Sequence, residues 1–285
     1  MKIYENFDLT EYNSYRIKAR CKTAYFPETE SDILEIYRTQ KELVLIGSGH
    51  NIILSKNYYE NCFVILNGNY NNYFIDNNVG TIEAESGITM LELSQIALRH
   101  SLSGIEIFYD IPSSLGGAVV MNAGASGEEI KNVILKVRYL NLVDFQVIEV
   151  NNEEISFEYR NSVFQKNPHK IVLKAWLQLS QKNRIEIKEK MENLKAKRWA
   201  KQPKNFPNAG SVFKRPEGYF VGTILEELGL KGFSIGGAKI SEKHAGFIVN
   251  FDNATGQDIL NIIKEVKIRV REKLNIELEI EQRII

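Results

Sequence analysis

The stretch that decides the fold is DIPSSLGGAVVMNAGASG, residues 110–127, in which small residues crowd together and the few large ones are apolar. Glycine lacks the Cβ atom that keeps a ligand away from the main chain, so such a segment lets peptide N–H groups approach a bulky anion. A tightly packed buried turn is the alternative for an isolated glycine pair, but the length of this stretch favours a ligand. It therefore predicts a loop that holds phosphate groups.

The composition is that of a globular protein without a broad charged surface. The 285 residues allow two or three domains, and 44% of them are hydrophobic. The 36 basic and 36 acidic residues cancel, so no nucleic-acid partner is indicated and any anion site must be local. Cys21 and Cys62 form no CxxC motif, which indicates free thiols and no metal site. Without a signal segment or a membrane-spanning run, we expect a cytoplasmic protein.

The first glycine turn of the chain comes earlier, after a buried strand. Residues 43–46 (LVLI) predict that strand, and it ends abruptly at GSGHN, residues 47–51. Ile52 replaces the third glycine of a dinucleotide-binding Rossmann motif, and residues 54–59 do not open a helix. The pattern therefore excludes a Rossmann fold. It leaves a glycine turn between strand-like segments, which continue at residues 63–66 and 81–84.

Strands and helices alternate along the rest of the chain. Alternating or apolar runs predict strands within residues 13–27, and at 133–143, 146–150, 171–179, 247–250 and 278–285. Residues 144–145 are expected to join the second and third of these in a tight turn. Helical spacing predicts helices that begin at Ser31 and that span residues 89–99, 185–199, 218–229 and 254–274. Two prolines at 203 and 207 mark the approach to another domain.

Two polar residues stand out by their position. Arg160 lies among aromatic residues in FEYRNSVF, residues 157–164, where a surface or stacking role is the alternative to function. Ser211 directly follows a second Asn-Ala-Gly loop, residues 208–210, so its hydroxyl is placed to project into a cleft. The chain has no G-x-S-x-G elbow, which disfavours a serine hydrolase.

Five ordered motifs give the chain a resemblance to the UDP-N-acetylenolpyruvoylglucosamine reductase family, the flavin reductases of peptidoglycan precursor synthesis. The motifs are residues 111–127, 159–164 (YRNSVF), 208–216, 236–245 (GGAKISEKHA) and 281–283 (EQR). The resemblance covers nearly the whole chain. It implies an α+β protein with a two-subdomain FAD-binding fold of the vanillyl-alcohol-oxidase kind and a C-terminal α+β substrate-binding domain.

The resemblance also implies where the domains divide. We expect FAD-binding subdomains at residues 1–66 and 67–200, and a substrate-binding domain at 201–285 whose C-terminal strand carries Glu281. One subgroup of the family has an extra tyrosine-bearing loop. The interval between Val163 and Lys201 is too short for that loop, so the chain falls in the other subgroup.

The activity implied by the resemblance is reduction of the enolpyruvyl ether of a UDP-sugar to UDP-N-acetylmuramate. NADPH gives hydride to FAD, and the reduced flavin gives hydride to the vinyl carbon of the substrate. Negative charge then develops on the adjoining carbon and its carboxylate, which calls for a cation nearby. Arg160 matches the family arginine for this task, Glu281 its partnering glutamate, and Ser211 the proton donor. We expect a monomer with no membrane or metal partner.

Other positions match family contacts to cofactor and substrate. The FAD contacts carry over to Gly47, Ser48, Gly49, His50, Asn51, Ile52, Pro112, Ser113, Ser114, Gly116, Gly117, Asn122 and Gly124. The substrate contacts carry over to Tyr159, Lys201, Lys214, Arg215 and His244. For the charged residues of the second set, a solvated surface position is the alternative.

The chain departs from the family pattern at several positions of these motifs. Asp110 and Ser113 stand where glycines are usual, Arg215 where asparagine is usual, and His50 where serine is common. Asp110 brings a carboxylate toward an anionic cofactor, so FAD is expected to bind weakly if this side chain faces the diphosphate. Two alternatives follow: a flavin oxidase with the cofactor linked covalently to His50, and a flavin or UDP-sugar binding module without turnover.

Overall fold

The structure, a computed structural model, describes residues 1–285. The chain forms two compact units, and each of them is assembled from three separate stretches of sequence. The first unit comprises Met1–Ile3, Tyr25–Ser48 and Phe63–Lys197. The second comprises Tyr4–Ala24, Gly49–Cys62 and Arg198–Ile285. The expected division into three domains at residues 66 and 200 stays a prediction.

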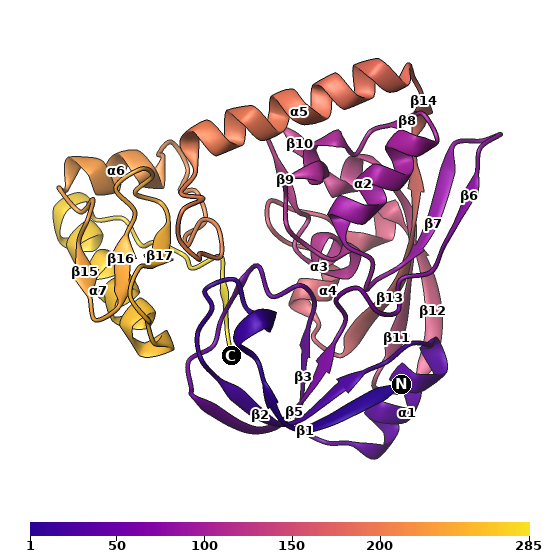
Figure 1. Ribbon diagram of the computed structural model, residues 1–285, viewed down its shortest axis with the longest axis horizontal. Helices are drawn as coiled ribbons and strands as arrows, with labels where there is room; N and C mark the ends of the chain where they lie inside the picture. Colours follow the sequence, from indigo (N-terminus) through magenta and orange to yellow (C-terminus); the bar gives the residue numbers. More distant parts are fainter. The chain divides into compact units, whose positions relative to one another are not determined.

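Helices and strands alternate along the chain (Figure 1). The helices are α1 (Glu30–Thr39), α2 (Met90–Arg99), α3 (Leu115–Val120), α4 (Val163–Lys166), α5 (Arg184–Lys201), α6 (Val221–Glu227) and α7 (Gly256–Leu274), with 3-10 turns η1 (Thr10–Tyr12), η2 (Glu106–Tyr109), η3 (Ile130–Asn132) and η4 (Asn152–Ile155). The longer strands are β1 (Lys2–Asp8), β2 (Arg20–Phe26), β3 (Leu43–Ile46), β5 (Tyr58–Ile65), β6 (Tyr73–Asp76), β7 (Thr81–Glu85), β11 (Ile134–Asn141), β12 (Gln146–Asn151) and β13 (Lys170–Gln178). The short strands are β4 (Ile52–Ile53), β8 (Leu102–Ser103), β9 (Gly124–Ala125), β10 (Glu128–Glu129), β14 (Ser180–Gln181), β15 (Ser234–Ile235), β16 (Ala238–Ile240), β17 (Ile248–Asn250) and β18 (Arg283–Ile284).

The first unit is built on an antiparallel sheet with the order β12-β11-β13-β7-β6. Central strand β13 supplies apolar side chains to both faces of this sheet, because side chains alternate along a strand. Val172 belongs to the core on one face and Ile171 to the core on the other. The pairing of β11 with β13 skips Leu173, so Leu173 and Lys174 together oppose Arg138 in a bulge.

Helices cover both faces of the five-stranded sheet. Helices α2, α3 and α4 lie on one face (Figure 1). Their side chains, such as Leu93, Ala118 and Phe164, share one apolar core with residues of β7, β11 and β13. On the other face α1 contributes Ile33, which packs with Leu140 of β11. A four-stranded sheet has the order β1-β2-β5-β3. Strand β3 is an edge strand of this sheet and leads into the glycine turn that begins at Gly47.

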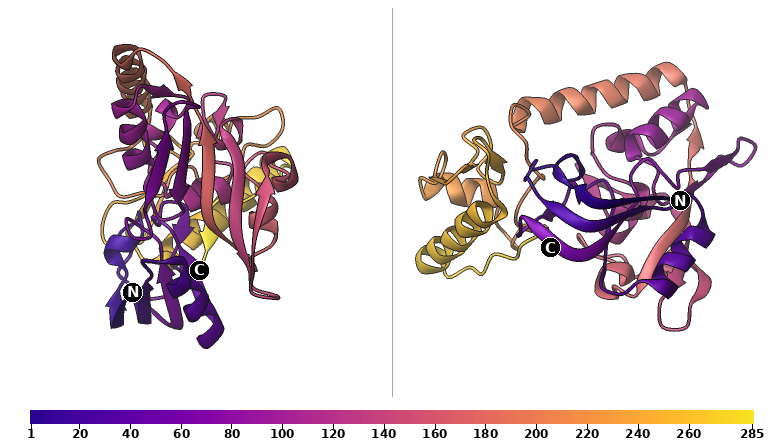
Figure 2. Two further views of the ribbon diagram at one scale, coloured as in Figure 1. Left: turned by 90° about the vertical axis from the view of Figure 1, so that its right-hand side faces the viewer. Right: turned by 60° about the horizontal axis from the view of Figure 1, so that its bottom comes forward.

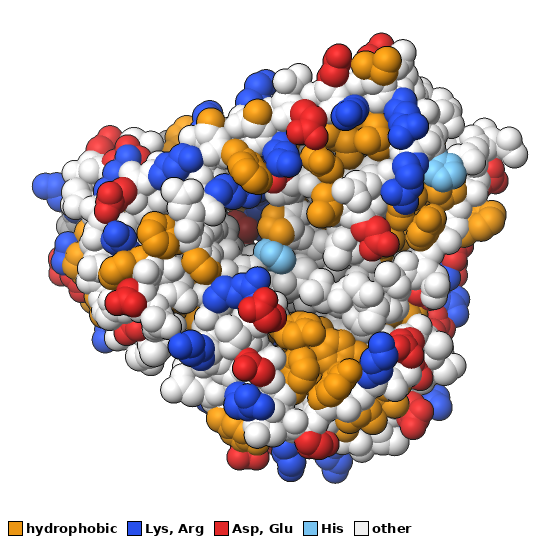
Figure 3. All heavy atoms as spheres, viewed as in Figure 1, with side chains coloured by type: hydrophobic (Ala, Val, Ile, Leu, Met, Phe, Trp, Pro, Cys, Tyr) orange, Lys and Arg blue, Asp and Glu red, His pale blue; other side chains and the backbone are white.

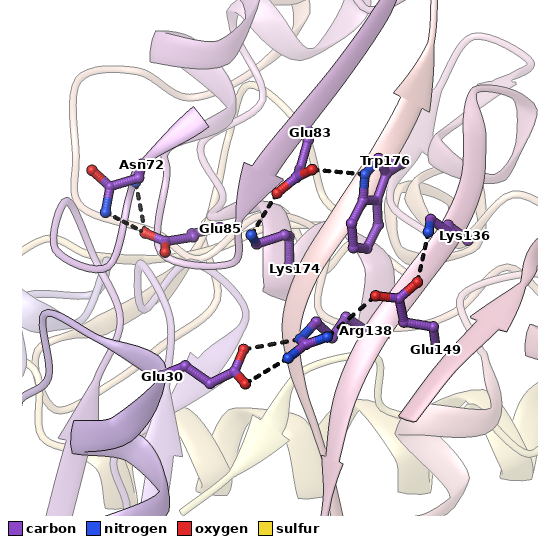
Figure 4. A network of polar contacts seen from close by, with 9 residues as sticks. All are labelled: Glu30, Asn72, Glu83, Glu85, Lys136, Arg138, Glu149, Lys174 and Trp176. Carbon is purple, nitrogen blue, oxygen red and sulfur yellow. Dashed lines mark hydrogen bonds and ion pairs between the residues drawn. The ribbon is translucent and has the colours of Figure 1, made fainter. Parts of the chain in front are cut away.

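Charged side chains fill the α1 side of the five-stranded sheet where the apolar core ends (Figure 4). Arg138 of β11 donates from Nε and Nη2 to the carboxylate of Glu30 of α1, at 3.0 and 2.9 Å. Lys174 Nζ donates to Glu83 at 2.5 Å, and Arg138 also reaches Glu149. The bidentate arginine pair fixes the orientation of α1. Both of its side chains are about one-third exposed, so it adds little net stability.

The second unit contains the antiparallel sheet β15-β16-β17, with α7 packed against it (Figure 2). Helix α7 begins in a capping box, because Thr255 Oγ1 accepts from the Asp258 N–H at 3.1 Å and the Asp258 carboxylate accepts from the Thr255 N–H at 2.9 Å. Its residues at helical spacing, including Ile259, Ile263 and Val266, are buried. Strands β18 and β4 pair in parallel, with Arg283 opposite Ile52.

Most of the predicted elements are confirmed, including β3, β7, α2, β13, α5, α6 and α7. The absence of a helix after the first glycine turn also holds, since Gly47 leads through a turn into β4. The first helix was expected to be capped by Ser31, which is wrong. Thr29 is its N-cap and forms a capping box with Asp32, so the helix begins at Glu30.

Three expected strand boundaries are also wrong. Only residues 20–26 of the segment 13–27 form a strand. The turn between β11 and β12 has four residues rather than two, because Asn141 pairs with Gln146. The expected C-terminal strand is reduced to Arg283–Ile284, so Glu281 precedes it. Here the chain changes partners: the Glu281 N–H donates to Val212 O at 2.8 Å, whereas the Arg283 N–H donates to Asn51 O at 2.9 Å.

The surface and the cysteines agree with the composition. On the face drawn in Figure 3, basic and acidic side chains are interspersed and form no large patch of one sign. No helix combines the length and the apolar character that crossing a membrane requires. Cys21 and Cys62 are free, as predicted.

Candidate active site

In the first unit, two of the loops predicted to bind FAD touch each other. Gly47 follows β3, and Ser114 is the N-cap residue of α3. A Cβ atom on Gly47 would collide with the Ser114 hydroxyl, so only glycine allows these two loops to meet this closely. Ser114 Oγ in turn accepts from the Gly117 N–H at 3.3 Å. Gly47, which opens the glycine turn, and the start of α3 therefore belong to one local structure of the first unit.

The main-chain N–H groups at the start of α3 are already used within the protein. Leu115 donates to Ile88 O and Gly116 to Ser86 O, both at 2.9 Å, while Gly117 donates to the Ser114 hydroxyl. These groups are therefore not available to a phosphate. Residues 114–117 form a tightly packed turn, in which the glycines allow close packing against the segment after β7, and their contact with FAD stays a prediction.

Two buried hydroxyls beside this turn have no hydrogen-bond partner. They are Ser86 Oγ and Ser113 Oγ. Buried polar groups in folded proteins are nearly always paired, so an orphaned hydroxyl marks a place for a ligand or water. Together with the close contact at Gly47, the two hydroxyls fit a polar cofactor such as FAD. Ser113 is among the predicted contacts, whereas Ser86 was missed, and its place between β7 and Gly87 is its only signal in the sequence.

Asn122, another predicted FAD contact, is fully buried, and its side chain is engaged by the protein. Its Nδ2 donates to the Glu129 carboxylate at 3.1 Å and to Glu158 O at 2.9 Å. Its Oδ1 accepts from the Lys131 N–H at 3.3 Å. The backbone of Asn122 is left-handed, with φ 44°, a conformation that asparagine adopts more readily than most residues. Asn122 therefore ties the loop after α3 to the segment that carries Arg160.

Arg160 is held by the carbonyls of that same loop. Its Nη2 donates to Gly124 O at 2.7 Å, and Nη1 lies 3.4 Å from Asn122 O. The guanidinium also lies 5.3 Å from the ring centroid of Tyr159. Arg160 is half-buried, and Tyr159 is exposed. The predicted catalytic arginine and the predicted cofactor positions Asn122 and Gly124 thus form one cluster, in which the loop orients the cation.

In the second unit, the rest of the first glycine turn meets the C-terminal segment. Gly49 has φ 71°, and a Cβ atom on it would collide with Tyr12 O, so the turn requires glycine there. Asn51 Nδ2 donates to Glu281 O at 3.2 Å. Asn51 also accepts the Arg283 N–H through its carbonyl. A predicted FAD contact therefore holds the main chain on both sides of Gln282, next to the predicted catalytic glutamate.

Ser211 and Glu281 lie on neighbouring segments of the second unit. Val212, which follows Ser211, accepts the Glu281 N–H at 2.8 Å. Ser211 forms an isolated bridge with Phe247, and its side chain is exposed. Glu281 is half-buried. The structure thus brings together two of the three predicted catalytic residues, and Arg160 belongs to the first unit.

The predicted substrate residues of the second unit have different environments. Lys214 Nζ donates to Glu279 at 2.5 Å, so its charge is partly neutralised. Arg215 is exposed and lies 4.6 Å from the Phe220 ring centroid. Lys201 is exposed at the end of α5. The solvated-surface alternative therefore remains for Lys201 and Arg215.

His244 is half-buried, and its ring is held in a fixed orientation. Nδ1 accepts from the Gly246 N–H at 3.1 Å, which leaves Nε2 as the nitrogen that carries the proton of the neutral ring. The ring meets Phe247 edge to face, with centroids 4.8 Å apart. Burial lowers the pKa of His244 below its ordinary value of 6.5. His244 is therefore a neutral hydrogen-bond donor at neutral pH.

Comparison with known proteins identifies the family of this chain. A family model described as the C-terminal domain of UDP-N-acetylenolpyruvoylglucosamine reductase matches residues 202–285, and one described as an FAD binding domain matches residues 22–150. The UDP-N-acetylenolpyruvoylglucosamine reductase of Francisella tularensis is 41% identical over 99% of this chain and 99% of its own. The chain belongs to the UDP-N-acetylenolpyruvoylglucosamine reductase family.

Two further reductases support this assignment. The UDP-N-acetylenolpyruvoylglucosamine reductase of Caldanaerobacter subterraneus is 40% identical over 100% of this chain and 94% of its own. The crystal structure of the reductase from Thermus caldophilus is similar with a TM-score of 0.83 and 28% identity, covering 99% of this chain and 98% of that one. The family and the fold that the five motifs predicted are confirmed. The roles of individual residues in this reductase stay predictions.

Within the reductase fold, the predicted site residues divide between the two units. The first unit carries Gly47, Ser48, the loop around α3 and Arg160. The second carries Gly49–Ile52, Ser211, Glu281 and the substrate candidates from Lys201 to His244. Each unit therefore contributes candidate residues for both the cofactor and the chemistry.

Proposed function

We propose that this chain catalyses the NADPH-dependent, FAD-mediated reduction of UDP-N-acetylglucosamine enolpyruvate to UDP-N-acetylmuramate. The observation that carries the proposal is the match along essentially the full chain to reductases of that name, with Arg160, Ser211 and Glu281 all present. We also propose that it acts as a monomer in the cytoplasm, and that its partners are the UDP-sugar and NADPH, with no nucleic acid or membrane.

FAD, when bound beside Gly47, Ser86 and Ser113, would supply the hydride-transfer chemistry between NADPH and the vinyl carbon of the substrate. Arg160 contributes a permanent cation for the charge that develops on the adjoining carbon and its carboxylate. Because Gly124 O holds one of its nitrogens at 2.7 Å, the cation keeps one orientation and needs no rearrangement during the reaction. Glu281 is proposed as the partnering glutamate that helps to orient and stabilise the group on which this charge develops.

Ser211 supplies the proton that completes the reduction. Its exposed side chain reaches a substrate without displacing the core, while its main chain is anchored by the bridge to Phe247. Serine is a weak acid in water, so its hydroxyl acts as a proton donor only where neighbouring groups stabilise the alkoxide. His244, a neutral donor in the same unit, is proposed to bind the diphosphate or sugar.

One spectrum and one stopped-flow experiment test the function. Purified protein should show the yellow flavin absorption bands, and acid precipitation should release the flavin. Under anaerobic conditions NADPH should bleach the flavin, and the enolpyruvyl UDP-sugar should restore its absorbance. Failure of the substrate to restore absorbance with flavin bound would favour the binding module. Flavin that stays with the acid-precipitated protein would favour the oxidase linked at His50.

The role of Ser211 is tested by separating the two half-reactions. We expect Ser211→Ala to leave flavin reduction by NADPH intact and to slow reoxidation by the substrate by about 100- to 10,000-fold, the usual contribution of a positioned proton donor. Ser234→Ala, an exposed serine of β15 in the same unit, is the matched control and should change neither step. Equal slowing of both steps in Ser211→Ala would remove this serine from the proton-donor role.

A further inference from the structure

Gln282 is a buried amide between the catalytic candidate Glu281 and strand β18. Gln282 is only 3% exposed. Its Nε2 donates to Ala209 O at 3.0 Å and lies 3.4 Å from both Gly210 O and Ser211 O. One side-chain nitrogen therefore faces three consecutive carbonyls of the loop that ends at the predicted proton donor.

The other end of the amide meets a buried tyrosine. The Tyr15 hydroxyl donates to Gln282 Oε1 at 2.9 Å, and Tyr15 is fully buried. This assignment of oxygen and nitrogen is required by chemistry, because three carbonyls can only accept hydrogen bonds and must face the NH₂ group. Tyr15 is itself held, since Asn250 Nδ2 donates to Tyr15 O at 2.7 Å. Both ends of the Gln282 amide are thus satisfied inside the unit.

We propose that Gln282, oriented by Tyr15, is a positioning residue that fixes the loop bearing Ser211 relative to Glu281. The proposal rests on the proposed function, because it assigns Gln282 a part in proton delivery. The main chain beside Gln282 is tied down at two points: the Glu281 N–H donates to Val212 O, and the Arg283 N–H donates to Asn51 O. The bond to Asn51 lies outside the segment that carries Ser211, so the amide has a support that does not belong to the 209–211 loop.

The geometry gives Gln282 a role beyond filling space. Hydrogen bonds from main chain to main chain already hold Val212, because its N–H donates to Gly246 O at 3.1 Å and its carbonyl accepts from Glu281. The Gly210 N–H donates to Asn208 Oδ1 at 3.2 Å, a bond within the loop itself. The amide of Gln282 adds the side-chain tether between residues 209–211 and the segment of Glu281. Without it Ser211 keeps its main-chain bridge to Phe247, but the loop on its N-terminal side loses the side-chain link to the segment of Glu281, so the serine hydroxyl is held less precisely.

The test uses a variant pair that removes the tether without orphaning the buried Tyr15 hydroxyl, while Ala209 O loses its donor in either variant. Gln282→Met alone would orphan the Tyr15 hydroxyl, whereas Tyr15→Phe together with Gln282→Met replaces both partners by apolar side chains of similar size. In the flavin-loaded double variant we expect reoxidation by the enolpyruvyl UDP-sugar to slow by about 100-fold, as a displacement near 1 Å does. Flavin reduction by NADPH should be unchanged.

Two further measurements separate positioning from a general loss of structure. Amide hydrogen exchange of the substrate-free protein should be faster in the peptide spanning residues 207–214 of the double variant, and unchanged elsewhere. The solvent deuterium isotope effect on reoxidation should rise, because proton transfer becomes rate-limiting. Tyr59→Phe is the control, since it removes a hydroxyl that donates to Ile285 O at 2.8 Å in the same unit and should alter neither half-reaction.

The outcomes distinguish this proposal from the function on which it rests. Unchanged reoxidation and unchanged exchange in the double variant would overturn the positioning role, as would equal slowing of both half-reactions. If the wild-type protein itself fails to be reoxidised by the substrate, the proposed function fails. In that case faster exchange in residues 207–214 of the double variant would still demonstrate the tether, and unchanged exchange would overturn the tether as well.

Discussion

The two units each contain a buried side-chain amide that organises a part of the candidate active site. Asn122 in the first unit is 0% exposed, and Gln282 in the second is 3% exposed. Asn122 connects segments at most 36 residues away through its side chain, whereas Gln282 connects to residues 73 and 267 positions away. The first amide stabilises a local motif, and the second joins segments that meet only in the folded unit.

The two amides also differ in what their backbones require. Asn122 has φ 44°, so both its conformation and its hydrogen bonds favour asparagine. Gln282 does not have a positive φ, and it directly precedes strand β18. Its backbone therefore sets no special requirement, and glutamine is favoured here by its hydrogen bonds. Substitutions should therefore affect the two sites through different contributions to the free energy of unfolding.

The largest effect is expected for Asn122→Ala. It leaves the Glu129 carboxylate, the Glu158 carbonyl and the Lys131 N–H without their buried partner. It also puts alanine, which adopts positive φ less readily than asparagine, at a position with φ 44°. We expect the free energy of unfolding to fall by about 3–5 kcal/mol, measured by denaturant titration. Asn122→Gly is the control, because it relieves the backbone cost and loses only the hydrogen bonds. Equal stability of Asn122→Gly and the wild type would show that those bonds contribute little.

A smaller effect is expected for Gln282→Met. This change leaves the buried Tyr15 hydroxyl and Ala209 O unpaired, so the free energy of unfolding should fall by about 1–3 kcal/mol. Adding Tyr15→Phe should recover part of this loss, because it removes one of the orphaned groups. The double-mutant cycle gives the coupling between the two side chains. Additive losses would mean that the tyrosine and the amide are not coupled, and the contrast with Asn122 would then rest on backbone conformation alone.

The smallest effect concerns pH, and it should arise in the second unit. Burial holds the pKa of folded His244 below 6.5, so the unfolded chain takes up a proton at higher pH than the folded one. The contribution of the neutral His244 ring to the free energy of unfolding is fully present above pH 6.5. It declines as the pH falls from there toward the lower pKa of the folded state. The Oδ1 of asparagine can still accept from the Gly246 N–H. We therefore expect His244→Asn to reduce the decline, measured as the fall of the thermal unfolding midpoint with decreasing pH. His100→Asn at an exposed position of the first unit should leave the decline as it is.

The same contrast explains what the sequence could predict. Motifs that are continuous along the chain, such as YRNSVF at 159–164 and the stretch 110–127, pointed to Arg160 and its loop. The spacing of apolar residues was enough to predict α2, α7 and β13, because the buried residues of each element lie close together in the sequence. The sequence also led to Ser211 and Glu281, because family resemblance marked them individually.

Features that depend on distant partners could not be predicted. Nothing near Gln282 in the sequence indicates that Tyr15 lies against it, and the C-terminal segment shows the alternation of a full strand although it changes partners at Gln282. The N–H groups of residues 115–117 were available to a phosphate by composition, yet tertiary contacts with Ser86 and Ile88 use two of them. Ser86 itself became a candidate only because its burial leaves the hydroxyl unpaired.

The span between Tyr15 and Gln282 also sets an order of assembly. Closing a chain segment this long costs conformational entropy that only the completed contacts repay, so the tether forms late in folding. During synthesis the N-terminal segments emerge first, and Tyr15 must wait for residue 282, whereas Asn122 meets all its side-chain partners by residue 158. The cluster around Arg160 can therefore take shape on the growing chain, and the loop of Ser211 gains its final support only after residue 282 has been made.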